Sequence, residues 1–212
     1  MALILFDFDG VLADTLGDML RFAQEVCNEL GIQHLVTQGD LSNLEVMSFA
    51  EYGRACEVPE QMVEEFVCRC TRKFGAKKSP PAIFEKLDEI VRKLSASHIL
   101  GVVTGNTKQN VKTFLVEHEL DDRIRAVYGV DSPGSKSEKI SLAQTQFAVE
   151  NEAVFMVGDS LSDIRAARQA GVKSIAVSWG HQSLEMLIRA APDYLVHLPQ
   201  ELLELLEKLA SN

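Results

Sequence analysis

The sequence has no long hydrophobic run. No window approaches the roughly 18 consecutive apolar residues that a transmembrane helix needs. The apolar stretch at the N-terminus is short, has no basic region before it and is interrupted by Asp7, so we expect no signal peptide. An Asn-x-Ser/Thr acceptor for glycosylation is also absent. These absences favour a cytoplasmic protein that has no membrane partner.

Positive charge is scarce as well. The chain has 21 Lys and Arg against 31 Asp and Glu, which gives a formal net charge of -10 at pH 7. This balance argues against nucleic-acid binding, because such proteins need a basic surface. An anionic substrate can bind only where local cations or a metal ion offset the field. Whether the protein is a monomer or a homodimer is left open by the sequence.

Cysteine is sparse, and its spacing is not that of a zinc motif. The four cysteines are Cys27, Cys56, Cys68 and Cys70. On a helix, the side chains of Cys68 and Cys70 point away from each other. No second such pair or histidine cluster accompanies them in the sequence, so we expect reduced, mostly buried thiols rather than a zinc site.

A short apolar run, Ala2 to Phe6, opens the chain and is typical of a parallel strand buried on both faces. Apolar residues then recur at helical spacing from Leu16 to Leu30, from Leu41 to Ala55 with Asp40 as the N-cap, and from Pro59 to Phe74. Ser79-Pro80-Pro81 breaks this pattern. Residues 15–79 are therefore predicted to be all-helical.

Beyond Pro81 the pattern alternates between helices and strands. Strands are predicted at Ile99–Val103, Ala126–Val130, Ala153–Val157, Ser174–Ser178 and Tyr194–Val196, and helices at about Ala82–Leu94, Thr107–His118, Glu138–Ala148, Asp163–Ala170, Ser183–Ala190 and from Pro199 onwards. Such alternation predicts an α/β fold, a Rossmann-like parallel sheet with helices on both faces. The N-terminal strand needs that sheet, so residues 1–14 and 80–212 form the core. Residues 15–79 form a cap domain inserted over the carboxyl ends of the strands, as a lid.

Polar clusters follow four of these strands. They are Asp7 and Asp9, Thr104-Gly105-Asn106-Thr107, Asp131 to Lys136, and Gly158 to Asp163. Each has an ordinary structural explanation: Thr104, Asn106 or Asp163 could cap a helix, and Lys136 could be a solvated lysine. All four fall at the carboxyl edge of the sheet, where open α/β sheets bind ligands. The combination therefore predicts a site there.

The residue types indicate phosphate chemistry. Asp7 is a possible nucleophile towards phosphorus, and Asp9 would protonate the leaving-group oxygen and then activate water. Asp7 and Asp159 are hard oxygen ligands suited to Mg²⁺, and Asp163 would orient a ligand or a metal-bound water. The carboxylates and a phosphate exceed the single charge of Lys136, so the charge count itself predicts a divalent cation.

The phosphate itself needs neutral donors as well as charge. The Thr104 hydroxyl, the Asn106 side chain and nearby backbone N–H groups, including that of Gly105, can hold phosphate oxygens. Lys136 would balance the charge of Asp7 and the phosphate.

The chain resembles the haloacid dehalogenase superfamily along nearly its whole length. The matching motifs are Asp7-Phe8-Asp9-Gly10-Val11-Leu12, Val103-Thr104-Gly105-Asn106, Lys136 with Ile140, and Gly158-Asp159-Ser160-Leu161-Ser162-Asp163. The helical insert, Ser178-Trp179-Gly180 and Pro192 to Val196 are similar to the phosphoglycolate phosphatase-like branch. The resemblance implies a Rossmann-like core, Mg²⁺ dependence, Asp7 as nucleophile and metal ligand, and Asp9 as acid/base and a metal ligand through its backbone carbonyl.

Two positions depart from the usual motifs. The third motif often reads Lys-Pro, whereas here it is Lys136-Ser137, and Lys139 is close enough to be the alternative lysine. The return from cap to core often reads Pro-Gly-Val, whereas here it is Pro81-Ala82-Ile83. Neither departure removes a catalytic group, but both weaken the transfer of any particular substrate.

The favoured function is a Mg²⁺-dependent phosphatase that acts on a small phosphorylated metabolite. The presence of Asp9 argues against true dehalogenation, because a departing halide ion needs no acid to protonate it. A β-phosphoglucomutase-like phosphotransferase stays open and would use a cap residue such as Arg54. A phosphonate hydrolase would need a Schiff-base lysine, but the cap lysines Lys73, Lys77 and Lys78 are expected to be solvated. A non-catalytic binding protein of the same fold is the remaining alternative.

Overall fold

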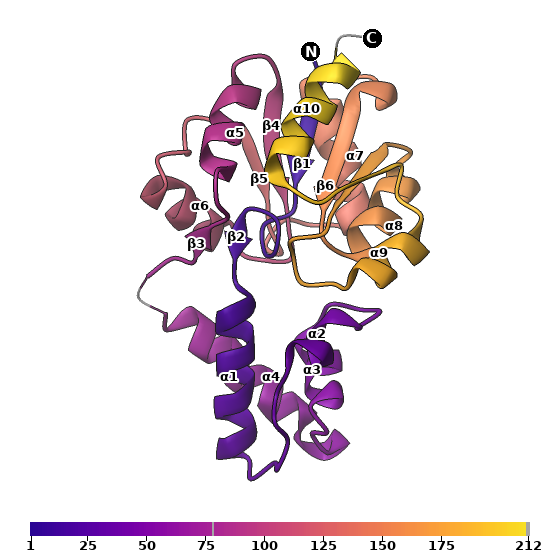
Figure 1. Ribbon diagram of the computed structural model, residues 1–212. Coiled ribbons are helices and arrows are strands. Elements are labelled where there is room, and N and C mark those ends of the chain that lie inside the picture. Colours follow the sequence, from indigo (N-terminus) through magenta and orange to yellow (C-terminus); the bar gives the residue numbers. More distant parts are fainter. Residues whose placement is uncertain (78, 211–212) are drawn as a thin grey trace.

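The computed structural model describes residues 1–77 and 79–210 and contains the predicted parallel sheet (Figure 1). The sheet has six parallel strands in the order β5-β4-β1-β6-β7-β8. Their bounds are β1 Leu3–Phe6, β4 Ile99–Val103, β5 Ala126–Tyr128, β6 Val154–Gly158, β7 Lys173–Val177 and β8 Tyr194–Val196. All four residues of β1 are fully buried, because the strand lies centrally between β4 and β6. The predicted α/β class is confirmed.

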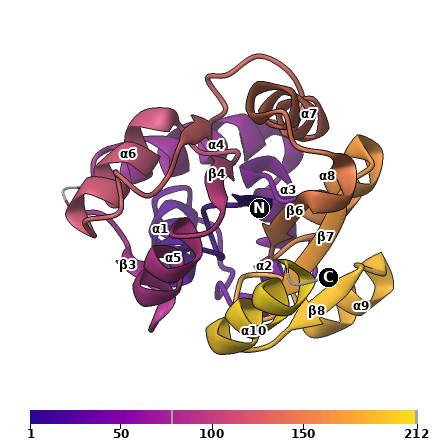
Figure 2. The same cartoon turned by 90° about the horizontal axis from the view of Figure 1, so that it is seen from above.

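Helices cover both faces of the sheet (Figure 2). Side chains of α5 (Leu87–Ser95), α6 (Lys108–Glu117) and α10 (Pro199–Ala210) belong to the apolar cluster on one face, and those of α7 (Lys136–Phe147) and α8 (Leu161–Ala170) to the cluster on the other. The alternating apolar residues of β1 contribute to both clusters, Ile4 and Phe6 to one and Leu3 and Leu5 to the other. The remaining elements of the core are η1 (Asn151–Ala153) and α9 (Leu184–Ala190).

Four helices separate from the sheet and form the cap: α1 Leu16–Glu29, α2 Gln38–Ser42, α3 Phe49–Ala55 and α4 Glu60–Gly75. They pack around an apolar cluster of their own that includes Val26, Tyr52 and Phe66. Figure 1 shows the cap below the sheet, facing the carboxyl ends of the strands. The domain boundaries at 14/15 and 79/80 remain a prediction.

The chain leaves and re-enters the core through a short two-stranded sheet. β2 (Ala13–Asp14) pairs antiparallel with β3 (Ala82–Ile83), with Ala13 opposite Ile83 and Asp14 opposite Ala82. The two connections between core and cap are thereby held side by side next to the end of β1.

Two helix predictions were wrong in detail. The single helix expected over Leu41–Ala55 is two helices, α2 and α3, because Ser48 caps α3 by accepting a hydrogen bond from the Glu51 amide. Asp40 is not the N-cap but the third residue of α2, where it closes a capping box with Thr37. The helix expected from Ala82 begins only at Leu87, since Ala82–Ile83 forms strand β3.

Candidate active site

Three neighbouring strands deliver the predicted polar residues to one edge of the sheet. Asp7 follows β1, Thr104 follows β4 and Asp159 follows β6, and β1 lies between the other two. The Asp7 amide still donates to the carbonyl of Val157, at 2.8 Å, so its backbone is fixed by the sheet. The carboxylate of Asp7 therefore emerges at the end of a central strand of the sheet.

Three buried carboxylates converge at this edge. One oxygen from each of Asp7, Asp159 and Asp163 lies within 4.8 Å of the others. The Nζ atom of Lys136 lies 3.2 Å from Asp7 Oδ1 and 2.5 Å from Asp163 Oδ1. Lys136 is the first residue of α7, whose capping box between Ser135 and Glu138 sets where the helix starts. A local capping signal thus places the lysine.

The geometry also separates the two candidate lysines. Lys136 forms the ion pairs to the aspartates, and although burial lowers its pKa, the charges of Asp163 and Asp7 raise the pKa above the ordinary lysine value overall. Lys139 is buried beside it, and burial followed by the charge of Lys136 lowers its pKa. Lys136 is accordingly the lysine positioned to balance the site.

Burial makes the carboxylates hard to ionise together. The pKa of Asp7 is raised from 3.8 to about 7, chiefly by burial and also by the charges of Asp163 and Asp9, while the charge of Lys136 opposes the rise. Burial also raises the pKa of Asp159 well above its ordinary value, with Asp163 and Asp7 adding to the effect. The single charge of Lys136 therefore does not offset the burial of these carboxylates.

The residues present fit a magnesium ion. Asp7 Oδ1 is buried and, beyond its ion pair with Lys136, has no hydrogen-bond partner among the described residues. Asp159 packs against two glycines, because a Cβ at Gly10 or Gly180 would lie only 2.0 or 2.3 Å from its Oδ2 atom. Asp7 and Asp159 thus offer oxygens suited to a small hard cation.

Asp163 differs from Asp7 and Asp159 because it also caps a helix. Its Oδ2 accepts hydrogen bonds from the amide and hydroxyl of Ser160, at 3.1 and 2.6 Å, as the capping box of α8. Its Oδ1 faces Lys136. These contacts suit the predicted task of orienting other groups.

The loop after β4 supports Asp9. The Asn106 Nδ2 atom donates to Asp9 Oδ2 at 3.0 Å, and the Asn106 amide donates to Thr104 Oγ1 at 3.0 Å. Gly105 is exposed and has no heavy atom within 4 Å of where a Cβ would be, so its backbone is open to a ligand. Asn106, expected to hold phosphate, here orients a carboxylate.

A cavity of about 200 Å³ lies between core and cap. Asp9, Asn106 and Phe8 line it from the core, and Asp18 and Lys77 line it from the cap, among others. The side chains of Asp18 and Lys77 form an ion pair at its wall.

The expectation that the cap lysines are solvated was wrong for the two that the structure describes. The side chains of Lys77 and Lys73 are only 23% and 24% exposed. Both form ion pairs, Lys77 with Asp18 and Lys73 with Glu25 and Glu29. Lys78 lies outside the described residues. A run of lysines does not by itself reveal acidic partners that another helix supplies.

Sequence reasoning missed His181. This residue is 3% exposed, its amide donates to Asp159 Oδ2 at 2.7 Å, and its Nε2 lies 3.2 Å from Thr15 Oγ1, where the cap begins. Burial lowers its pKa, so the ring is neutral near pH 7. The available signal was its position just after Gly180, the glycine that makes room for Asp159.

Comparison with known proteins identifies the family. The model of the haloacid dehalogenase-like hydrolases matches residues 4–177, which is most of the chain. The chain belongs to this family. The match runs from the first residues of β1 to the end of β7 and so includes all four polar clusters as well as the cap.

Curated relatives extend over almost the whole protein. A phosphoglycolate phosphatase of Synechococcus elongatus is 28% identical over 99% of this chain and 99% of its own. An N-acetylmuramic acid 6-phosphate phosphatase of Pseudomonas aeruginosa is 26% identical over 97% of this chain and 94% of its own. The predicted enzyme class, a haloacid dehalogenase-type phosphatase, is confirmed by these relatives.

Solved structures agree on the fold. A haloacid dehalogenase-like family hydrolase from Streptococcus pneumoniae superimposes with a TM-score of 0.83 at 23% identity, covering 97% of this chain and 98% of that one. Among the described residues, no helix combines the length and the apolar character needed to cross a membrane.

Proposed function

We propose that this protein is a Mg²⁺-dependent phosphatase that hydrolyses a small phosphomonoester through an aspartyl-phosphate. The observation that carries the proposal is that Asp7 and Asp9, which are separated by one residue, have different surroundings. Asp7 is buried against Lys136 with one oxygen lacking a hydrogen bond. Asp9 is held by Asn106 and lines the cavity. One carboxylate is thus placed to attack and the other to move a proton.

In the first step, an oxygen of Asp7 attacks phosphorus while the bond from phosphorus to the leaving oxygen breaks. Asp9 gives its proton to that oxygen. In the second step, Asp9 takes a proton from water as the water oxygen attacks phosphorus, which releases phosphate and the free Asp7 carboxylate. The Asn106 hydrogen bond holds Asp9 in position for both transfers.

The remaining residues stabilise charge. Lys136, the Thr104 hydroxyl and the open backbone at Gly105 would bind phosphate oxygens. Asp7 and Asp159 would hold Mg²⁺, with the backbone carbonyl of Asp9 as a further ligand. When bound, the ion neutralises charge on the phosphate oxygens and on the nucleophile. The crowding of carboxylates that raises the pKa of Asp7 and Asp159 supports this assignment.

The cavity favours a small polar substrate such as phosphoglycolate or a sugar phosphate. Its volume is about 200 Å³, and its wall combines Asp9 and Asn106 of the core with Lys77 of the cap. The Lys77 ammonium at the cap wall could pair with a carboxylate of the substrate in place of Asp18. The curated relatives are named for two different substrates, so family membership alone does not select one.

The mutase alternative gains no support from Arg54. This arginine pairs with Glu51 and Glu60 on the cap, and its side chain is 42% exposed. It is a surface ion-pair residue and does not line the cavity between core and cap.

The direct test is a screen of phosphomonoesters with the purified protein, with Mg²⁺ or with excess chelator. We expect hydrolysis of at least one small substrate with Mg²⁺ and a loss of more than about 100-fold with chelator. Undiminished turnover in chelator would contradict the metal dependence. Transfer of the phosphoryl group to a second hydroxyl, without release of phosphate, would favour the mutase.

A further inference from the structure

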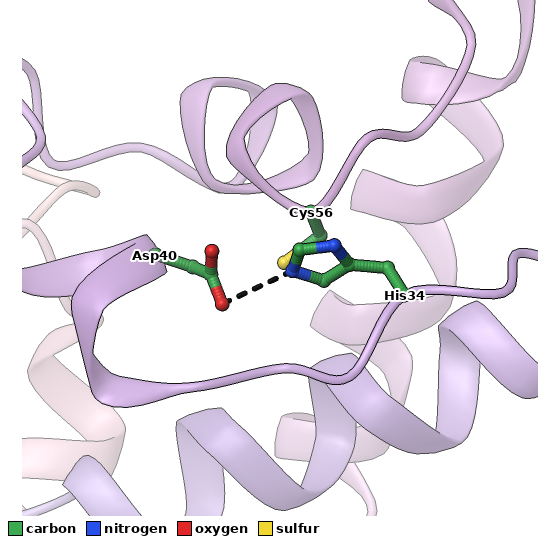
Figure 3. Close-up of side chains that lie close together, drawn as sticks. All are labelled: His34, Asp40 and Cys56. Atoms are coloured by element: carbon green, nitrogen blue, oxygen red, sulfur yellow. Dashed lines mark ion pairs between the residues drawn. The ribbon is translucent and has the colours of Figure 1, made fainter.

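A second cluster of metal-binding side chains lies inside the cap, away from the sheet edge. His34 follows α1, Asp40 lies in α2 and Cys56 ends α3, and Figure 3 shows the three side chains converging. One ligand atom of each lies within 4.8 Å of the others. Among the described residues, only this set and the aspartates of the candidate active site form such a group.

The histidine ring is oriented as a metal ligand would be. Its Nε2 atom is buried and points at Asp40 Oδ2, 3.1 Å away, yet it has no hydrogen-bond partner of good geometry among the described residues. Its Nδ1 atom faces Glu57 Oε2 at 3.9 Å. Metal-binding histidines commonly turn their second nitrogen towards a carboxylate, which fixes the ring.

The other ligands are held in place as well. Asp40 Oδ2 accepts hydrogen bonds from the amide and hydroxyl of Thr37, at 2.7 and 2.9 Å, so the carboxylate is fixed by the capping box of α2. Cys56 is fully buried. A second fully buried thiol, Cys27 of α1, belongs to the same apolar cluster of the cap.

We propose that His34, Asp40 and Cys56 bind one zinc ion in the cap. One thiolate, one imidazole nitrogen and one carboxylate oxygen are ligand types that zinc takes, and a water molecule would complete a four-coordinate shell. Binding displaces the thiol proton to solvent, which makes the occupancy pH-dependent. The soft sulfur ligand distinguishes this site from the all-oxygen magnesium site at the sheet edge.

The ion would join parts of the cap that are otherwise connected by loops. It links the segment between α1 and α2, α2 itself, and the end of α3. The end of α2 touches the core, because Ser183 donates through its amide to the carbonyl of Ser42, the last residue of α2, at 2.9 Å. The zinc ion therefore stabilises the part of the cap that rests on the core.

The test uses Co²⁺ as a coloured substitute for zinc in full-length protein that has been stripped of metal and kept reduced. We expect one equivalent of Co²⁺ to give an intense thiolate-to-cobalt absorption band, and one equivalent of Zn²⁺ to abolish it. His34→Gln changes a half-buried loop residue and leaves the apolar packing intact, and it should lose the tight binding. Zn²⁺ should also raise the Tm of the wild type by about 5–10 °C at 100-fold above the Kd, and not that of His34→Gln.

Cys56→Ser and Cys70→Ser form a matched pair, since both remove a buried thiol of the same cap cluster. Cys56→Ser should lose the band and Cys70→Ser should keep it. Asp159→Asn, at the magnesium site, should also keep it, so that the failure of one site is distinguishable from that of the other. Absence of the band in the wild type, or its retention in both His34→Gln and Cys56→Ser, would overturn the proposal.

Discussion

Charge is arranged in opposite ways at the sheet edge and on the cap. At the sheet edge, Asp7, Asp159 and Asp163 are buried together, and among residues 1–77 and 79–210 only Lys136 pairs with Asp7 and Asp163. On the cap, acidic and basic side chains are matched: Lys73 pairs with Glu25 and Glu29, and Asp18 pairs with Arg21 and Lys77. The first arrangement raises the pKa of Asp7, and the second lowers the pKa of Asp18.

This difference distinguishes charged residues that serve the proposed reaction from charged residues that serve the structure of the cap. Buried like charges cost stability and persist where a ligand or reaction needs them, whereas partly exposed pairs contribute about 0–1 kcal/mol each. Substitutions at the sheet edge should therefore change activity strongly and can even stabilise the fold. Substitutions of the cap pairs should have small effects. The predictions that follow run from the largest expected effect to the smallest.

Asp7→Asn should abolish hydrolysis, with a loss of at least about 10³-fold in kcat, because the amide cannot attack phosphorus. Without metal, the variant should nevertheless be the more stable protein at neutral pH. The Asp7 pKa is raised from 3.8 to about 7, so its contribution to stability is fully present below about pH 4 and is lost as the pH rises through 7. Thermal unfolding with chelator, from pH 4 to 8, checks this. An equal pH slope in both proteins would contradict it.

Lys136→Met and Lys139→Met separate the two lysines. Lys136→Met removes the cation paired with Asp7 and Asp163, so kcat should fall about 10³-fold. Stability should fall by about 3 kcal/mol, because carboxylates are left unpaired. Lys139→Met should retain activity within a few fold. Steady-state kinetics and urea unfolding of both variants measure the contrast, and equal losses would argue against the assignment to Lys136.

Asp9→Asn should lower kcat most for the substrates with the poorest leaving groups. Alkyl phosphates need a proton on the departing oxygen and should lose about 10²-fold, whereas aryl phosphates with acidic phenols should lose much less. Measuring kcat over a series of leaving groups gives the slope. A uniform loss across the series would show that Asp9 has another role.

Asp18→Asn should have the smallest effect, about 0.5 kcal/mol at pH 7, because its ion pairs are partly exposed. Burial opposes the effect, but hydrogen bonds from Lys77 and Arg21 lower the Asp18 pKa below 3.8 overall. Its stabilisation is thus present above about pH 4 and is lost below it, which is the opposite sign to Asp7. Unfolding of the wild type and the variant between pH 2.5 and 7 tests this sign.

Much of the fold and the candidate site could be predicted from the sequence, because it depends on local signals. The buried run of β1 leads directly into Asp7 and Asp9, and residues that follow parallel strands meet at one sheet edge. Errors arose where a local signal was ambiguous. The helical spacing from Leu41 to Ala55 hid the break at Ser48.

Other features could not be predicted, because they depend on contacts between distant segments. His181 reaches Asp159 and Thr15 only once β7 has packed beside β6. Lys77 and Asp18 are 59 positions apart in the sequence, and they contact each other only because α4 packs on α1. The three candidate zinc ligands have no motif spacing, since His34, Asp40 and Cys56 are brought together only by the folded cap.

The sequence by itself determined the parallel sheet, the helical insert and the polar residues at the strand ends, since short-range periodicity and motif spacing encode them. Only the tertiary structure decided which lysine faces Asp7, that Asn106 holds Asp9, and that cap charges are paired. It also decided that His34, Asp40 and Cys56 share one pocket of the cap. The physical reason is that ion pairs and ligand clusters depend on distances of a few ångströms between segments, which are set by how the buried apolar faces pack.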